Sequence, residues 1–159
     1  MNYASSGQQE ILWLLNQLYV LMLRQEKSFV IIEEPEAHIY PTLQREVILF
    51  IIQFMNITGS KVIVTTHSPY IFAMSNLLYY AGSLEQKKEP NKLVDIIDKN
   101  HRIHPSKFLA WKLFSDKEAL RVNDDKENEF DTSLIDEVSD IINKDYTKLY
   151  YYEVDNGET

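Results

Sequence analysis

Two carboxylates and a histidine follow apolar segments at points where strands are expected to end. Residues 29–32 are all β-branched or aromatic, and Glu33 and Glu34 follow them directly. A second apolar segment, 61–66, leads into His67. In parallel sheets, ligands bind beyond the carboxyl ends of the strands. Carboxylates there can hold magnesium through water and orient an attacking water, while a histidine can contact phosphate. These residues predict a phosphoryl-transfer site; the alternative is a core strand that runs into a solvated acidic turn.

A long helix is expected before the first strand. Residues 11–23 are mostly apolar, and the polar stretch before them contains capping-box spacings, either Ser6 with Gln9 or Ser5 with Gln8. The apolar side chains of this segment cover nearly the whole circumference of a helix. We therefore expect the helix to be buried on most sides.

The first strand and the next helix are predicted from apolar runs and from the proline and glycine residues that bound the helix. Residues 29–32 show no alternation of apolar and polar side chains, so we expect a strand covered on both faces, as in an α/β sheet. Pro41 suits the first turn of a second helix over residues 42–57, and Gly59 should end it.

The second strand is expected to lead into a short helix. Ser68 is a suitable N-cap and Pro69 a suitable first helical residue, which predicts a helix through residue 74. The apolar segments 77–81 and 93–97 are then expected as further strands.

The C-terminal third has a different character. Residues 107–114 and 118–122 predict a hairpin, and the spacing of apolar residues from 133 to about 151 predicts an amphipathic helix. We therefore expect two parts, a lobe over residues 1–104 and an extension over residues 105–159.

Composition excludes several classes of protein. The chain of 159 residues has no cysteine, so disulfide scaffolds and cysteine-bound zinc are excluded. The N-terminus lacks the pattern of a signal peptide, and the longest apolar run, residues 47–52, is too short to cross a bilayer. We expect a cytoplasmic protein that does not enter the membrane. The net charge of −8 argues against broad nucleic-acid binding, but a local basic groove for DNA stays open.

Three motifs, in order, resemble those of one ATPase family. Residues 4–8, Ala-Ser-Ser-Gly-Gln, are similar to the ABC signature motif; residues 29–34 resemble a Walker B strand with its catalytic glutamate; and His67 resembles the switch histidine. The segments Glu-Glu-Pro-Glu-Ala-His-Ile-Tyr-Pro and Thr-Thr-His-Ser-Pro-Tyr are similar to the ABC-type AAA ATPases related to the OLD (overcoming lysogenization defect) proteins. The resemblance implies an α/β fold: a partial P-loop sheet of ABC/RecF-like type with flanking helices, followed by a C-terminal β-hairpin and helix.

The resemblance also implies roles for individual residues. The signature residues would contact, in trans, the γ-phosphate of a nucleotide held by a partner subunit; they are Ser5, Ser6, Gly7 and Gln8. Glu33 would hold the water shell of Mg²⁺, Glu34 would position the hydrolytic water, and His67 would contact the γ-phosphate. The roles of Glu36 and His38 stay open at this point, although a structural role is favoured for His38.

One part of the family pattern is missing from the sequence. No GxxxxGK[ST] motif occurs, so the cradle for the β-phosphate and its lysine are absent. We expect the N-terminal lobe that carries them to lie outside this chain, as a separate lobe or a second subunit. The chain would then bind ATP and Mg²⁺ only with that lobe, would form a homodimer when complete, and would be inactive alone.

Two other functions are compatible with parts of the sequence. A catalytically inactive interaction module could keep the fold and bind a protein partner through exposed apolar surface. A nuclease of the OLD type would need the acidic metal ligands of a Toprim domain, for which Asp95 and Asp98 are the obvious candidates. Their spacing and the short chain after them argue against the nuclease.

Overall fold

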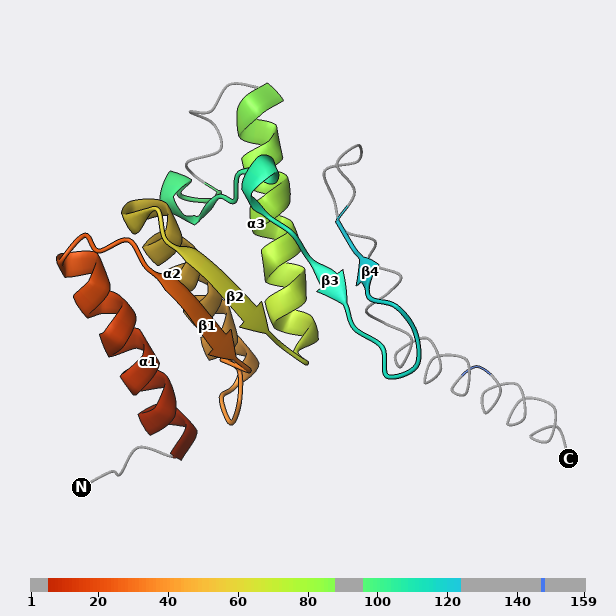
Figure 1. Ribbon diagram of the computed structural model, residues 1–159, viewed down its shortest axis with the longest axis horizontal. Coiled ribbons are helices and arrows are strands. Elements are labelled where there is room, and N and C mark those ends of the chain that lie inside the picture. The colour runs from red at the N-terminus through yellow and green to blue at the C-terminus, as the bar shows by residue number, and fades with distance from the viewer. Residues whose placement is uncertain (1–5, 88–95, 124–146, 148–159) are drawn as a thin grey trace, which may run out of the picture.

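The computed structural model describes residues 6–87, 96–123 and 147, and within them the fold is mixed α/β (Figure 1), as expected. The described part contains three α-helices, a two-stranded parallel sheet and a two-stranded antiparallel hairpin. In chain order the elements are α1 (Ser6–Leu23), β1 (Phe29–Glu33), α2 (Pro41–Thr58), β2 (Lys61–Thr65), α3 (Pro69–Lys87), the 3₁₀ turns η2 (Lys99–His101) and η3 (Pro105–Lys107), β3 (Trp111–Lys112) and β4 (Leu120–Arg121).

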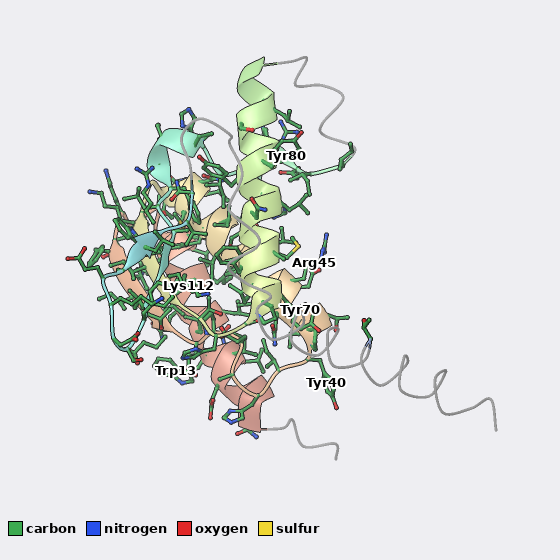
Figure 2. The ribbon with its side chains drawn as sticks, turned by 90° about the vertical axis from the view of Figure 1, so that its right-hand side faces the viewer. Trp13, Tyr40, Arg45, Tyr70, Tyr80 and Lys112 are labelled. Atoms are coloured by element: carbon green, nitrogen blue, oxygen red, sulfur yellow. The ribbon has the colours of Figure 1, made fainter. Side chains whose placement is uncertain are left out.

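Helix α2 is the central element of the fold, and its predicted ends are confirmed. Pro41 lies in its first turn, and Gly59 ends it in the left-handed conformation (φ 67°), with its N–H bonded to the carbonyl of Met55. Tyr40 precedes the helix and is exposed (Figure 2). In Figure 1, α2 lies behind the two strands, and it contacts both α1 and α3. One side of α2 therefore packs on the sheet and α1, and another side packs on α3.

The two strands are covered on one face only, which corrects the expectation that both faces would be buried. Strands β1 and β2 are parallel neighbours. Ile32, on the α2 side, is only 4% exposed, but Phe29, Ile31 and Ile63 on the other face are 63%, 60% and 48% exposed. Figure 1 shows no described helix in front of this face. The uninterrupted apolar run in β1 gives the strand two apolar faces. The described residues cover only the face that packs on α2.

Helix α1 is confirmed, but its predicted burial on most sides is wrong. Ile11 and Leu18 are buried against β1 and α2. By contrast, Leu12 and Tyr19 are exposed, and Trp13 (Figure 2) is 71% exposed. The cause is the same as for the sheet, because no described element packs on the other side of this apolar helix.

Helix α3 is longer than predicted and replaces the strand expected over residues 77–81. Ser68 is its N-cap, as predicted, and its hydroxyl accepts hydrogen bonds from the N–H groups of Tyr70 and Ile71. The helix then continues to Lys87 without a break. Ile71 and Leu78 are both buried against α2, because their spacing of seven residues returns them to the same side of a helix. This helical spacing prevails over the β propensity of the segment.

The remaining expectations are met in part. The hairpin is confirmed with shorter strands, β3 and β4. The strand expected over residues 93–97 lies partly outside the described residues, and Ile96 and Ile97 are not in a strand. The helix predicted from residue 133 lies outside them except for residue 147. Within the described parts of the chain, no helix combines the length and the apolarity needed to cross a membrane.

The uncovered sheet face predicts self-association of the isolated chain. Replacing the exposed Ile31 with glutamate should reduce dye binding and light scattering while changing the free energy of unfolding by no more than about 0.5 kcal/mol. Ile32 is the matched control because the same substitution there buries a charge and should unfold the chain. A parental chain that is strictly monomeric and binds no hydrophobic dye at high concentration would contradict this prediction.

Candidate active site

The carboxyl ends of β1 and β2 meet at one edge of the sheet. Glu33, the last residue of β1, pairs in register with Thr65, the last residue of β2. The N–H of Glu34 donates a hydrogen bond of 2.9 Å to the Thr65 carbonyl, so the backbone pairing of the two strands continues for one residue beyond β1. The acidic pair and the segment 66–68 are thereby held side by side, as the sequence predicted.

Glu34 and His67 come together at this edge. The distance between His67 Nε2 and Glu34 Oε1 is 3.5 Å, and the two side chains are 90% and 54% exposed. Both groups are therefore open to a ligand, and one small polar group could contact both at once. Glu33 is also exposed, and it lies on the uncovered face of the sheet with Ile31.

The loop between β1 and α2 has an unusual backbone. Glu34 has φ 42° and His38 has φ 61°, conformations that side-chain-bearing residues rarely adopt. A tight turn fixes the loop, with the Ala37 N–H bonded to the Glu34 carbonyl and the Ile39 N–H to the Glu36 carbonyl. Strained non-glycine backbone of this kind concentrates at functional sites.

Gly7 lies in direct backbone contact with this loop. A β-carbon at position 7 would lie only 2.5 Å from the β-carbon and from the carbonyl oxygen of His38. The absence of a side chain at Gly7 is therefore what allows the start of α1 to rest on the loop. The His38 imidazole also approaches Glu10 of α1, with 3.8 Å between Nδ1 and Oε2. The structural role favoured for His38 is consistent with these contacts.

The other residues of the signature-like motif can be placed only in part. Ser5 lies outside the described residues. Ser6 and Gln8 belong to the first turn of α1, but the structure does not describe their side chains. What the structure gives is the position of the helix start, next to the loop that carries Glu34.

An open hollow of about 650 Å³ joins the start of α1 to the strand ends. Glu10, Glu33, Glu34 and Thr65 supply its polar lining, and apolar residues of α1, β1 and the loop after β1 supply the rest. Among the described residues, no three acidic or histidine side chains gather closely enough to cage a metal ion. Magnesium, however, commonly takes only one or two carboxylates and completes its shell with water and phosphate. Glu33 and Glu34 are therefore suited to a magnesium site in which a bound nucleotide and water supply most of the ligands.

Sequence reasoning missed the contacts of Glu36. Its carboxylate accepts hydrogen bonds from Thr66, His67 and Ser68 across the sheet edge. The sequence shows an acidic residue at this position but not its partners, because the hydrogen bonds join segments about thirty residues apart. The partner of Ser68, Gln44 at the start of α2, was also missed.

Ligands of open parallel sheets bind beyond the carboxyl ends of the strands, and carboxylates in that place are compatible with magnesium and phosphoryl transfer. Comparison with known families agrees: the family model of the AAA ATPase domain matches residues 1–72. The match covers α1 to the start of α3 and includes every residue predicted for the site. This part of the chain is thus similar to an AAA-type ATPase fragment, a likeness that implies a nucleotide ligand. Comparisons with curated proteins and with solved structures gave no match.

Proposed function

We propose that this chain supplies half of the ATP-hydrolysing site of an OLD-like ABC ATPase. The observation that carries the proposal is the meeting of Glu34 and His67, with 3.5 Å between Oε1 and Nε2, at the carboxyl ends of two parallel strands. The similarity of residues 1–72 to the AAA ATPase domain supports the same activity.

The proposed chemistry assigns one task to each side chain. The Glu34 carboxylate accepts a hydrogen bond from the attacking water and aligns it with the γ-phosphate. His67 donates a hydrogen bond to a γ-phosphate oxygen, and Glu33 orients water molecules of the magnesium shell. When bound, magnesium supplies positive charge that offsets the charge of the phosphates. Catalysis of this kind depends mainly on positioning and electrostatics.

A second contribution is made in trans. The start of α1 carries backbone N–H groups that lack partners within the helix, and such helix ends favour phosphate. Ser5, Gly7 and Gln8, together with Ser6, contact the γ-phosphate of a nucleotide held by the opposing subunit. The described contact of Gly7 is with His38 of its own chain, so the trans role is supported by the resemblance of residues 4–8 to the signature motif.

The phosphate cradle comes from a lobe with a Walker A motif. No GxxxxGK[ST] occurs in the sequence, and of its four glycines none precedes a Lys-Ser or Lys-Thr pair. Phe29, Ile31 and Ile63 offer an uncovered apolar sheet face on which such a lobe can pack. The complete ATPase then forms a homodimer around two nucleotides.

The same apolar face favours a second candidate function. A catalytically inactive interaction module would use Phe29, Ile31 and Ile63 to bind a protein partner and would need no nucleotide. The two functions differ in their response to ATP. Once the missing lobe covers this face, the half-site requires nucleotide for dimer formation, whereas the interaction module binds its partner without nucleotide.

Binding of ATP by the isolated chain tests the need for the missing cradle. Because the P-loop and its lysine supply most contacts to the phosphates, we expect calorimetry with Mg²⁺ to show weak or no binding to the chain alone. Binding should appear when a lobe bearing Walker A is added. Tight binding to the chain alone would contradict this assignment.

A further inference from the structure

Glu36 bridges the two loops that form the candidate site. Its Oε1 atom accepts a hydrogen bond of 2.6 Å from the Thr66 hydroxyl. The same atom accepts hydrogen bonds from the backbone N–H groups of His67, at 2.8 Å, and Ser68, at 3.2 Å. Three donors from consecutive residues thus converge on one carboxylate oxygen. Hydrogen bonds to an ionised acceptor are the stronger kind.

The segment that receives this carboxylate is also held from its other side. The Ser68 hydroxyl donates a hydrogen bond of 2.5 Å to the side-chain oxygen of Gln44, which is buried in the first turns of α2. The Gln44 amide group in turn donates to the Ile39 carbonyl, at the end of the loop that contains Glu36. The segment 66–68 is therefore held at its backbone by Glu36 and at the Ser68 side chain by Gln44.

Side chains of the protein already occupy the N–H groups at the start of α3. The N–H groups at the beginning of a helix attract negative charge. At α3, the Glu36 carboxylate accepts a hydrogen bond from the His67 N–H, and the Ser68 N–H is shared between Glu36 and the Thr66 hydroxyl. The Ser68 hydroxyl accepts hydrogen bonds from the N–H groups of Tyr70 and Ile71. Phosphate is thus not needed to satisfy these groups. The His67 imidazole, by contrast, is exposed and lies beside Glu34.

The second oxygen of Glu36 distinguishes this residue from an ordinary surface acid. Oε2 is buried and has no hydrogen-bond partner among the described residues. Burial of an unpartnered carboxylate oxygen is unfavourable. A cost of this kind is tolerated where the other contacts of the residue hold it in place, and the three hydrogen bonds to Oε1 do so here.

We propose that Glu36 is a positioning residue that fixes the backbone of His67 and thereby sets the distance between the His67 imidazole and Glu34. Glu34 and Glu36 belong to one short, strained loop. The loop therefore carries the Glu34 carboxylate directly, and it holds the His67 backbone through the hydrogen bond to Glu36. The consequence for ATP hydrolysis rests on the proposed function, but the anchoring of His67 does not.

Hydrogen exchange of the full chain tests the anchoring. In Glu36→Ala, the His67 amide should exchange at least roughly tenfold faster, because it loses a hydrogen bond to a charged acceptor. Glu36→Gln keeps an acceptor oxygen and should give a smaller acceleration. Glu46→Gln is the matched control: Glu46 is an exposed acid at the start of α2 without contact to this segment, and its replacement should leave the exchange unchanged.

Comparison with Leu78 separates local anchoring from general stability. Leu78 is buried in α3, so its amide should keep the parental exchange rate in both Glu36 variants. An unchanged His67 rate in Glu36→Ala would overturn the proposal. Equal acceleration at His67 and Leu78 in both variants would also overturn it, because Glu36 would then support the fold as a whole.

Turnover in the complete ATPase tests the consequence for catalysis. Glu36→Ala should lower kcat with little change in KM, and in a His67→Ala background the same substitution should lower kcat less than about twofold, since Glu36 acts through His67. Multiplicative losses in the double variant would overturn the positioning role. If the parental mixture shows no turnover, the proposed function fails, whereas the exchange experiment still decides whether Glu36 anchors His67.

Discussion

Replacing Glu34 with glutamine is expected to lower ATP hydrolysis by roughly 10²–10⁴-fold once a Walker A-bearing lobe completes the site. Glutamine keeps the shape of the side chain and one acceptor oxygen but loses the negative charge that orients and polarises the attacking water. ATP binding should survive, because contacts to the phosphates come mainly from the Walker A loop and the opposing signature helix. The measurements are steady-state phosphate release and, separately, nucleotide affinity.

Glu46→Gln serves as the matched control for Glu34→Gln. It makes the same chemical change at an exposed acid outside the hollow and should keep the parental rate. If Glu34→Gln hydrolyses ATP as fast as the parental protein, Glu34 is not the residue that activates water. Glu33, which is exposed at the end of β1, would then be the candidate.

Loss of the ATP-dependent dimer is the second large effect that we expect. With hydrolysis blocked by Glu34→Gln, ATP should hold two complete subunits together through Ser5 and Gly7 in trans. Adding Ser5→Arg places a long side chain where the γ-phosphate must lie, so the dimer should disappear. Sedimentation or light scattering with and without ATP measures the change.

An arginine elsewhere on the same helix separates this effect from added charge. Gln17 is exposed on α1, well along the helix from its start. Gln17→Arg in the Glu34→Gln background should therefore leave the ATP-dependent dimer intact. A dimer that persists in Ser5→Arg, or that forms equally well without ATP, would contradict the trans assignment and favour the interaction module.

Local signals were sufficient to predict the first half of the fold. Pro41 and Gly59 mark the ends of α2 through fixed backbone preferences, and Ser68 marks the start of α3 through a side-chain cap. Strands β1 and β2 were predicted correctly from their β-branched runs. These features act over a few residues and so can be recognised without tertiary structure.

Burial was predicted less well because it depends on what packs on each surface. The apolar residues Trp13 and Ile31 were expected to be covered, yet no described element covers them. In α3, the segment after residue 74 resembled a strand because it is rich in leucine and tyrosine. Contact of Leu78 with the core beside α2 fixes it as helix instead. Neither outcome can be derived from the local sequence alone.

The candidate site shows the same division between local and long-range information. The proximity of Glu34 and His67 follows from two strand ends in one parallel sheet, which the sequence does indicate. The hydrogen bonds of Glu36 and the close approach of Gly7 to His38 depend on how loops fold against each other. The sequence therefore predicted that Glu34 and His67 lie close together, but not the contacts that hold them in place.

ATP turnover of three samples tests the central claim most directly: the chain alone, a lobe with a Walker A motif alone, and the two together with Mg²⁺. We predict turnover only in the mixture, and its loss when the chain carries Glu34→Gln. Turnover by the chain alone would contradict the claim that it is a half-site. An inactive mixture in which the two parts nevertheless bind each other would contradict the catalytic role and leave the interaction module as the function.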